Sequence, residues 1–223
     1  MKEKIAYACF CTDAIHEGHR NILREAKKRG TVVAGVLSDR EMVRYNRFPA
    51  VSLEERIALL EAEPEVERVF VQDAIMYDEV IASLKPDFVV HGDNWRGGPM
   101  SAIRENVLAN LKKMGGELIE VPYTWNPDVK KIDERMKERL VMPEFRRRRL
   151  RRLLEIVPIV KTIEVHDGLT GLLAEKTVVE HEGGLDQFDA LWISSLCDST
   201  AKGKPDIELV DMSSRIRTID DVM

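Results

Sequence analysis

The sequence predicts an α/β fold built on a doubly wound parallel sheet. Apolar, β-branched runs of strand length recur along the first half of the chain, and segments with helical spacing separate them. We expect five strands, at residues 5–10, 31–37, 66–71, 88–91 and 117–121. Strands that alternate with helices at this spacing lie parallel in one sheet, and such sheets bind ligands at the carboxyl ends of their strands.

Local signals place the helices between these strands. Apolar residues recur at helical spacing from Ile15 to Ala26, and Gly30 is a suitable C-terminal stop. Ser52 and Glu55 form a capping-box pattern for a helix that reaches Ala62. Further helices are expected at residues 40–45, 78–84 and 103–114.

The composition is that of a soluble globular protein, with 44% hydrophobic and 33% charged residues. The net charge of −5 gives no support to a nucleic-acid partner, since a binder of the phosphate backbone is basic. Three cysteines are too few for a disulfide framework or a zinc site. No apolar stretch approaches the roughly 20 residues of a membrane span, and no signal-peptide pattern precedes the first strand. We therefore expect a cytoplasmic protein with no membrane partner.

The first strand ends in a polar segment that contains Asp13, His16, Gly18 and His19 and leads into the first helix. Unpaired N–H groups at a helix N-terminus carry partial positive charge, so this is a natural phosphate site. His16 and His19 are three residues apart and can share one side of the first turn. Each can donate an N–H to phosphate oxygens, and either can take a proton as negative charge approaches. The alternative is two surface histidines beside a helix that Asp13 caps.

The segment DAIHEGH, residues 13–19, resembles the HxGH signature of the cytidylyltransferase-like nucleotidyltransferases, which have a Rossmann-like parallel sheet. Within that group it is most similar to enzymes that make CDP-glycerol, CDP-ethanolamine and CMP-phosphonates. The resemblance implies that His16 and His19 are catalytic and stabilise the transition state at the α-phosphorus of CTP. It also implies that Cys11, Thr12, Asp13 and Gly18 lie around the nucleotide. Mg²⁺ is expected on the triphosphate, with Asp13 as the nearest candidate metal ligand.

The fourth strand leads into HGDNWRGG, residues 91–98. A flat aromatic ring beside carboxylate and amide groups suits a nucleobase and ribose. The segment resembles the GDDW-type segment of the family, with Asp93 and Trp95 on matching positions and Asn94 in place of an acid. We therefore expect His91, Gly92, Asp93 and Trp95 to contact the cytidine. The alternative is that the glycines shape a turn and Trp95 covers the core.

Arg47 and Arg56 resemble the family's basic loop and its EQR-type helix start, which contact the acceptor phosphate and the triphosphate. Planar guanidinium groups suit bidentate phosphate recognition, so both arginines are catalytic candidates. Asn46 stands where relatives usually have lysine. The alternative is a solvated charged face.

The fifth strand continues into VPYT, residues 121–124, as in phosphonate-specific relatives, which makes Thr124 a nucleotide-binding candidate. Those relatives continue with an ISST-type segment that holds the β- and γ-phosphates. This chain has WNPDVKKI, residues 125–132, in its place. Lys130 or Lys131 can supply positive charge to these phosphates, but a flexible ammonium group holds them with poorer geometry than a preformed set of backbone N–H groups. A non-catalytic nucleotide-binding remnant is therefore kept as an alternative.

We predict a nucleotidyltransferase domain at residues 1–128, a helical linker at 129–157 and a separate segment at 158–223. The linker contains six arginines between residues 146 and 152, but its apolar edge favours an amphipathic helix over a nucleic-acid site. In the last segment we expect a strand at residues 159–165, a helix at 169–179 and a second strand at 188–196. This segment resembles the beginning of phosphoenolpyruvate mutases of the isocitrate-lyase superfamily, through HDGL at 166–169, DALWISSL at 189–196 and the run 198–206. The family implies phosphate binding by residues 194–196 and a gating-loop position for Asp206.

A β/α barrel cannot close from so small a part, so we expect an incomplete barrel segment without mutase activity. Its strand edges require a cover, which is one basis for expecting a homodimer. A nucleotidyltransferase joined to a mutase resembles the bifunctional proteins of phosphonate biosynthesis. By this association, the expected substrates are CTP and a phosphonate such as 2-aminoethylphosphonate or 2-hydroxyethylphosphonate, with glycerol 3-phosphate as the alternative acceptor.

Overall fold

The computed structural model describes residues 3–44, 48–97, 100–122, 130–132, 134–135, 138, 142–181, 184–207 and 210–222. The chain divides into two compact units, Met1–Leu150 and Arg151–Met223. The helix α7 (Pro143–Ile156) crosses this division, which falls within the predicted linker. Within the described ranges, no helix has the length and apolar character needed to cross a bilayer.

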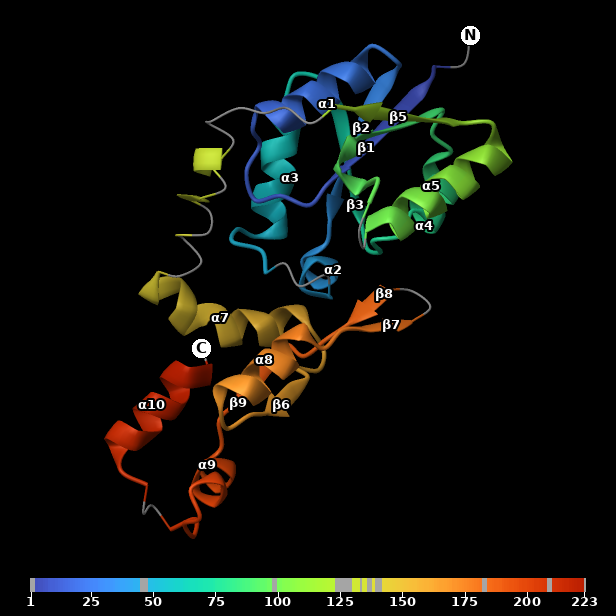
Figure 1. Cartoon of the computed structure of the whole chain (residues 1–223). Coiled ribbons are helices and arrows are strands. Elements are labelled where there is room, and N and C mark those ends of the chain that lie inside the picture. The colour runs from blue at the N-terminus through green and yellow to red at the C-terminus, as the bar shows by residue number, and fades with distance from the viewer. Residues whose placement is uncertain are drawn as a thin grey trace. The chain divides into compact units, whose positions relative to one another are not determined.

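The first unit is built on a five-stranded parallel sheet, as predicted (Figure 1). The strand order is β3-β2-β1-β4-β5, and every neighbouring pair is parallel. The strands end within one residue of the predicted boundaries, and the strands β1 and β2 are continuous apolar runs of the kind that is buried in parallel sheets. They are β1 (Ile5–Phe10), β2 (Thr31–Leu37), β3 (Val66–Gln72), β4 (Phe88–Gly92) and β5 (Glu117–Val121).

Helices cover both faces of this sheet (Figure 1). Side chains of β1 alternate between two cores, so Ala6 and Ala8 pack with α1 and α3, whereas Tyr7 packs with α4 and α5. This alternation defines a doubly wound α/β unit. The helices are α1 (Glu17–Lys27), α2 (Asp39–Arg44), α3 (Leu53–Glu61), α4 (Asp78–Leu84) and α5 (Ser101–Met114).

Gly35 of β2 leaves the space that the Tyr7 hydroxyl occupies. That hydroxyl donates a 2.6 Å hydrogen bond to Gln72 Oε1 in the buried sheet. A Cβ atom on Gly35 would lie 2.0 Å from Tyr7 Oη and 2.5 Å from its Cζ. We expect Gly35→Ala to lower the free energy of unfolding by about 1–3 kcal/mol through overpacking, measured by urea denaturation. Gly97→Ala is the matched control, since nothing lies within 4 Å of its Cβ position, and equal losses in the two variants would contradict this explanation.

The second unit contains one parallel strand pair. The strands β6 (Thr162–Glu164) and β9 (Ala190–Trp192) are parallel, and α8 (Gly168–Lys176) lies between them in the chain. An antiparallel hairpin of β7 (Val179–His181) and β8 (Gly184–Asp186) follows α8 and was not predicted. This strand–helix–strand order agrees with the predicted elements, but the described residues show no barrel.

The predicted strand at 188–196 is too long, because a helix begins inside it. The hydroxyl of Ser194 accepts a 3.1 Å hydrogen bond from Cys197 N and caps α9 (Ser195–Ala201). A further helix, α10 (Met212–Val222), approaches α8 so closely that a Cβ atom on Gly168 would lie 2.6 Å from Asp221 O.

A buried carboxylate joins α9 to α10. Asp198 is 1% exposed, and its Oδ1 accepts hydrogen bonds from Thr218 Oγ1 at 2.8 Å and from Lys202 Nζ. Burial by itself would raise the pKa of Asp198, but the bonds from Lys202 and Thr218 outweigh burial, so the pKa lies below its ordinary value.

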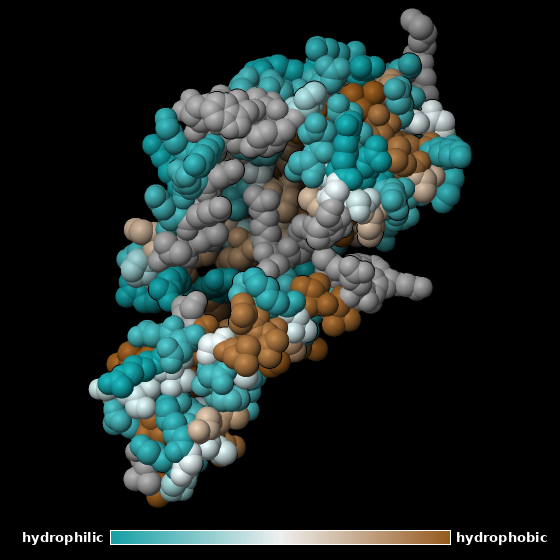
Figure 2. Space-filling view, viewed as in Figure 1, coloured by the Kyte–Doolittle hydropathy of each residue, from teal (hydrophilic) through white to brown (hydrophobic). Residues whose placement is uncertain are grey.

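Figure 2 shows apolar side chains on the surface of the second unit near α8, where Leu169, Leu172 and Leu173 are more than half exposed. The homodimer remains a prediction.

Candidate active site

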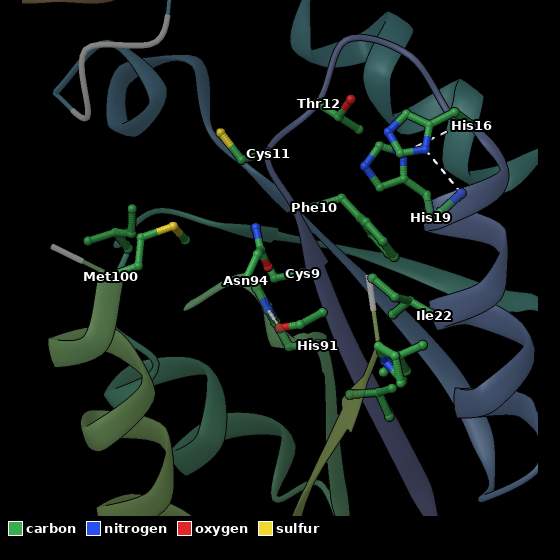
Figure 3. Close-up of a pocket in the computed structure, with 16 residues that line it drawn as sticks. Cys9, Phe10, Cys11, Thr12, His16, His19, Ile22, His91, Asn94 and Met100 are labelled. Atoms are coloured by element: carbon green, nitrogen blue, oxygen red, sulfur yellow. Dashed lines mark hydrogen bonds between the residues drawn. The ribbon is translucent and has the colours of Figure 1, made fainter. Parts of the chain in front are cut away.

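A pocket lies at the carboxyl ends of β1, β4 and β5 (Figure 3). The strand order reverses between β1 and β4, and this switch point is where doubly wound sheets bind their ligands. The cavity volume is about 340 Å³, which is within the range of small-molecule sites. It is lined by Cys9, Phe10, Cys11, Thr12, His16, Gly18, His19, Ile22, Ile75, Val90, His91, Gly92, Asn94, Met100, Val121 and Pro122.

His16 and His19 meet at the start of α1. His16 is the N-cap residue, and its Nδ1 accepts a 3.1 Å hydrogen bond from Gly18 N. His19 Nδ1 accepts a 3.3 Å bond from His16 N, so the two side chains form a reciprocal capping box. The rings stack with their centroids 3.6 Å apart and an interplanar angle of 22°. The alternative in which Asp13 caps this helix is therefore wrong.

These bonds determine which nitrogen of each imidazole carries the proton. A backbone N–H can only donate, so Nδ1 of both His16 and His19 must be unprotonated, and the neutral ring carries its hydrogen on Nε2. Phe10 contacts the edge of the His19 ring with centroids 5.4 Å apart and further restrains it. Both rings line the pocket, so the motif presents two Nε2–H donors beside the N–H groups of the first helical turn.

Thr12 shapes the segment between β1 and α1. Its Oγ1 donates a 2.7 Å hydrogen bond to Ala14 O and accepts a 3.3 Å bond from Ala14 N. Cys11, Thr12 and Gly18, which were expected to lie around the nucleotide, line the pocket. Cys9, which was not predicted, lies near the carboxyl end of β1, and burial raises the pKa of its thiol to about 12. Cys9 is therefore a neutral thiol at pH 7.

Trp95 does not stack on a ligand, because its indole ring is 0% exposed. The expected cytidine contact is wrong for this side chain, and the alternative that Trp95 covers the core agrees with the structure. Its ring stacks on His91, with centroids 3.7 Å apart and planes 8° apart, and its Nε1 donates a 2.9 Å bond to Glu120 Oε1. Trp95 thus supports His91, which lines the pocket.

Glu120 of β5 holds Trp95 in place through this hydrogen bond. It was not predicted as a site residue. Arg104 binds both carboxylate oxygens, at 2.9 and 3.0 Å, and Arg96 contributes a further bond at 2.9 Å. The bonds from Arg104, followed by those from Arg96 and Trp95, lower the pKa of Glu120 to about 2 against the opposing effect of burial.

Arg56 does not reach the pocket. It is 1% exposed, and its Nη1 donates a 2.6 Å hydrogen bond to Leu37 O, while its Nη2 binds Asp39. The guanidinium joins the end of β2 to α2 inside the first unit. The expected phosphate contact of Arg56 is therefore wrong, and its guanidinium binds groups of the protein instead.

Asp13 and Asp93 are half-buried and absent from the pocket lining. Asp13 Oδ1 accepts a 3.3 Å bond from Val51 N. Among the described residues, no group of three or more His, Cys, Asp or Glu side chains could hold a metal ion. Asp13 is therefore not part of a protein cage for Mg²⁺ in this part of the chain.

Asn94 and Met100 line the pocket without having been predicted, and Arg47 and Thr124 lie outside the described residues. Asn94 follows the carboxyl end of β4 and stands where the family's GDDW-type segment has an acid. Met100 precedes α5 and carries no sequence signal.

Comparison with known proteins shows which proteins the first unit is similar to. Residues 7–108 match a family model described as "Cytidylyltransferase-like". Bifunctional protein HldE of Desulfatibacillum aliphaticivorans is 30% identical over 123 residues, which are 54% of this chain and 24% of that protein. FAD synthase of Archaeoglobus fulgidus is 36% identical over 80 residues, 36% of this chain and 58% of that protein. Ethanolamine-phosphate cytidylyltransferase of Dictyostelium discoideum is 32% identical over 113 residues, 49% of this chain and 30% of that protein.

Residues 7–108 are therefore similar to the cytidylyltransferase-like nucleotidyltransferases, the same resemblance that the HxGH motif carries. The chain spans about a quarter of the HldE protein and between about a third and three fifths of the other two relatives.

Proposed function

We propose that the first unit transfers CMP from CTP to a small phosphonate and releases pyrophosphate. The single observation that carries the proposal is the stacked pair His16 and His19, which presents two Nε2–H donors in a pocket at the start of α1. The matching family model supports nucleotidyl transfer as the reaction class. The choice of CTP and of a phosphonate is ours.

The reaction needs no covalent enzyme intermediate. A phosphonate oxygen of the acceptor attacks the α-phosphorus of CTP, a new P–O bond forms, and the bond to the β-phosphate oxygen breaks to release pyrophosphate. Negative charge on the non-bridging oxygens is stabilised by the Nε2–H groups of His16 and His19 and by N–H groups at the start of α1. The protein contributes positioning and charge stabilisation.

Magnesium enters this proposal with the substrate. The described residues offer no cluster that fits a protein-held ion, so we place Mg²⁺ on the triphosphate of CTP through water-mediated contacts. No arginine or lysine occurs among the described residues that line the pocket. Arg47 and Thr124 remain proposed contacts of the phosphates and nucleotide.

The acceptor is proposed from the resemblance of the second segment to phosphoenolpyruvate mutases. An enzyme that forms carbon–phosphorus bonds beside a nucleotidyltransferase favours 2-aminoethylphosphonate or 2-hydroxyethylphosphonate over glycerol 3-phosphate. The relatives' names include both FAD synthase and a cytidylyltransferase, so the nucleotide must be tested directly. We also propose a cytoplasmic homodimer in which this chain has no mutase activity.

Pyrophosphate release is the decisive measurement. The full chain is incubated with Mg²⁺, with CTP or ATP, and with each phosphonate, glycerol 3-phosphate or ethanolamine phosphate in turn. We expect the highest kcat/KM with CTP and a phosphonate. Release that requires ATP or glycerol 3-phosphate would overturn the substrate assignment. Calorimetric binding of CTP without release in any mixture would favour the non-catalytic alternative.

A further inference from the structure

His91 has a defined proton position that differs from that of the HxGH histidines. Its Nδ1 lies 2.8 Å from Gly92 O, and a carbonyl oxygen can only accept a hydrogen bond. Nδ1 must therefore carry the proton, which leaves Nε2 of the neutral ring as an acceptor. Burial lowers the pKa of His91, which keeps the imidazole neutral at pH 7.

The ring is also held in one orientation. The indole of Trp95 covers one face of His91, with planes only 8° apart, and Trp95 is fixed in turn by Glu120. Arg104 holds both oxygens of that carboxylate. His91 lines the pocket, and these contacts hold its ring in place. It therefore offers the pocket a preorganised hydrogen-bonding group.

The pocket consequently has two walls of opposite hydrogen-bonding character. His16 and His19 offer Nε2–H donors, which suit phosphate oxygens. His91 offers an acceptor, which a deprotonated phosphate oxygen cannot satisfy. The group that His91 binds must therefore be an O–H or N–H donor of the ligand.

We propose that Nε2 of His91 accepts a hydrogen bond from a hydroxyl or amino group of the bound substrates and thereby selects for that group. This deepens the proposed function and rests on it. The donor has two possible sources with the same chemistry: a ribose hydroxyl or the cytosine amino group of the nucleotide, and the terminal hydroxyl or ammonium of the phosphonate. A neutral hydrogen bond of about 1 kcal/mol corresponds to selection of roughly 5- to 10-fold.

The test compares substrates that differ by one donor. The acceptor arm uses 2-hydroxyethylphosphonate and 2-aminoethylphosphonate against propylphosphonate. The nucleotide arm uses CTP against 2′-deoxy-CTP, 3′-deoxy-CTP and an analogue that lacks the 4-amino group. In the wild type, we expect one pair to differ in kcat/KM by roughly 5- to 10-fold.

His91→Phe keeps an aromatic ring against Trp95 and removes the acceptor. We expect the selective pair to become equal in this variant while the other pairs keep their ratios. His91→Asn is the second variant, because its amide N–H can replace Nδ1–H toward Gly92 O and nothing replaces Nε2. A purely structural role would lower all rates together and leave every ratio unchanged, which would overturn the proposal.

A readout without turnover separates this inference from the proposed function. The ¹⁵N resonances of His91 in the free protein at pH 7 report which nitrogen is protonated, and a proton on Nε2 would overturn the inference. If the wild type releases no pyrophosphate from any mixture, the proposed function fails. Calorimetric affinities of the same pairs for the wild type and His91→Phe then decide whether His91 reads a donor.

Discussion

Replacing His16 by asparagine is expected to lower kcat for pyrophosphate release by about 100- to 1,000-fold with little change in the melting temperature. Asparagine is a strong N-cap residue, so its side-chain oxygen can accept from Gly18 N as His16 Nδ1 does. Its amide N–H groups lie one bond closer to the backbone than the imidazole Nε2–H, and the amide takes up no proton. The substitution therefore separates the two roles that the imidazole combines.

His19→Gln is the companion variant. Glutamine at the third helical position completes a capping box, so it can accept from His16 N in place of His19 Nδ1. We expect the same loss of kcat as for His16→Asn. In the double variant, we expect the fold-loss of kcat to be smaller than the product of the two single fold-losses. Alanine at either position should lose both activity and helix stability. Retained activity in both cap-preserving variants would contradict transition-state stabilisation by the imidazoles.

Most of the first unit could be predicted because its signals are local. Continuous β-branched runs such as Thr31–Leu37 indicate buried parallel strands wherever they occur. Capping residues such as Ser52 and Glu55 mark a helix start within a few positions. The HxGH motif was equally local, since both histidines stand on one helical turn.

Arg56 and Trp95 show where local reasoning fails. Arg56 lies four residues before the buried Leu60 on the same helix, so helical periodicity already placed it on the inner face, but family resemblance favoured a phosphate contact. Trp95 is packed in the core, and its indole N–H donates to Glu120, which lies twenty-five positions later on β5. Such a partner on a distant strand has no signature near the tryptophan.

The second unit was harder to predict because its strands are only three residues long. The run at 188–196 is apolar enough for a longer strand, but the hydroxyl of Ser194 begins a helix within it. Helix α10 was missed although its start has a local signal, since Asp211 directly before it accepts a 3.0 Å hydrogen bond from Ser214 N and caps the helix.

Glu120→Gln is expected to lower the free energy of unfolding of the first unit by about 3 kcal/mol at pH 7, and to lose that effect in acid. The pKa of Glu120 is about 2 in the folded chain and ordinarily 4.5, a difference worth roughly 3 kcal/mol. Because the folded pKa is depressed, this stability is present above about pH 4.5 and disappears as the pH falls through about 2.

Urea denaturation followed by tryptophan fluorescence, to which the buried Trp95 contributes, checks this expectation between pH 7 and pH 2.5. Glu117→Gln is the matched control, since Glu117 lies on the same strand and is exposed. The two curves of stability against pH should differ most at pH 7 and converge in acid, because only Glu120 carries bonds from Arg104, Arg96 and Trp95. A gap that stays constant with pH would mean that Glu120 stabilises the fold by packing, and His91 would then lose the electrostatic support inferred for its orientation.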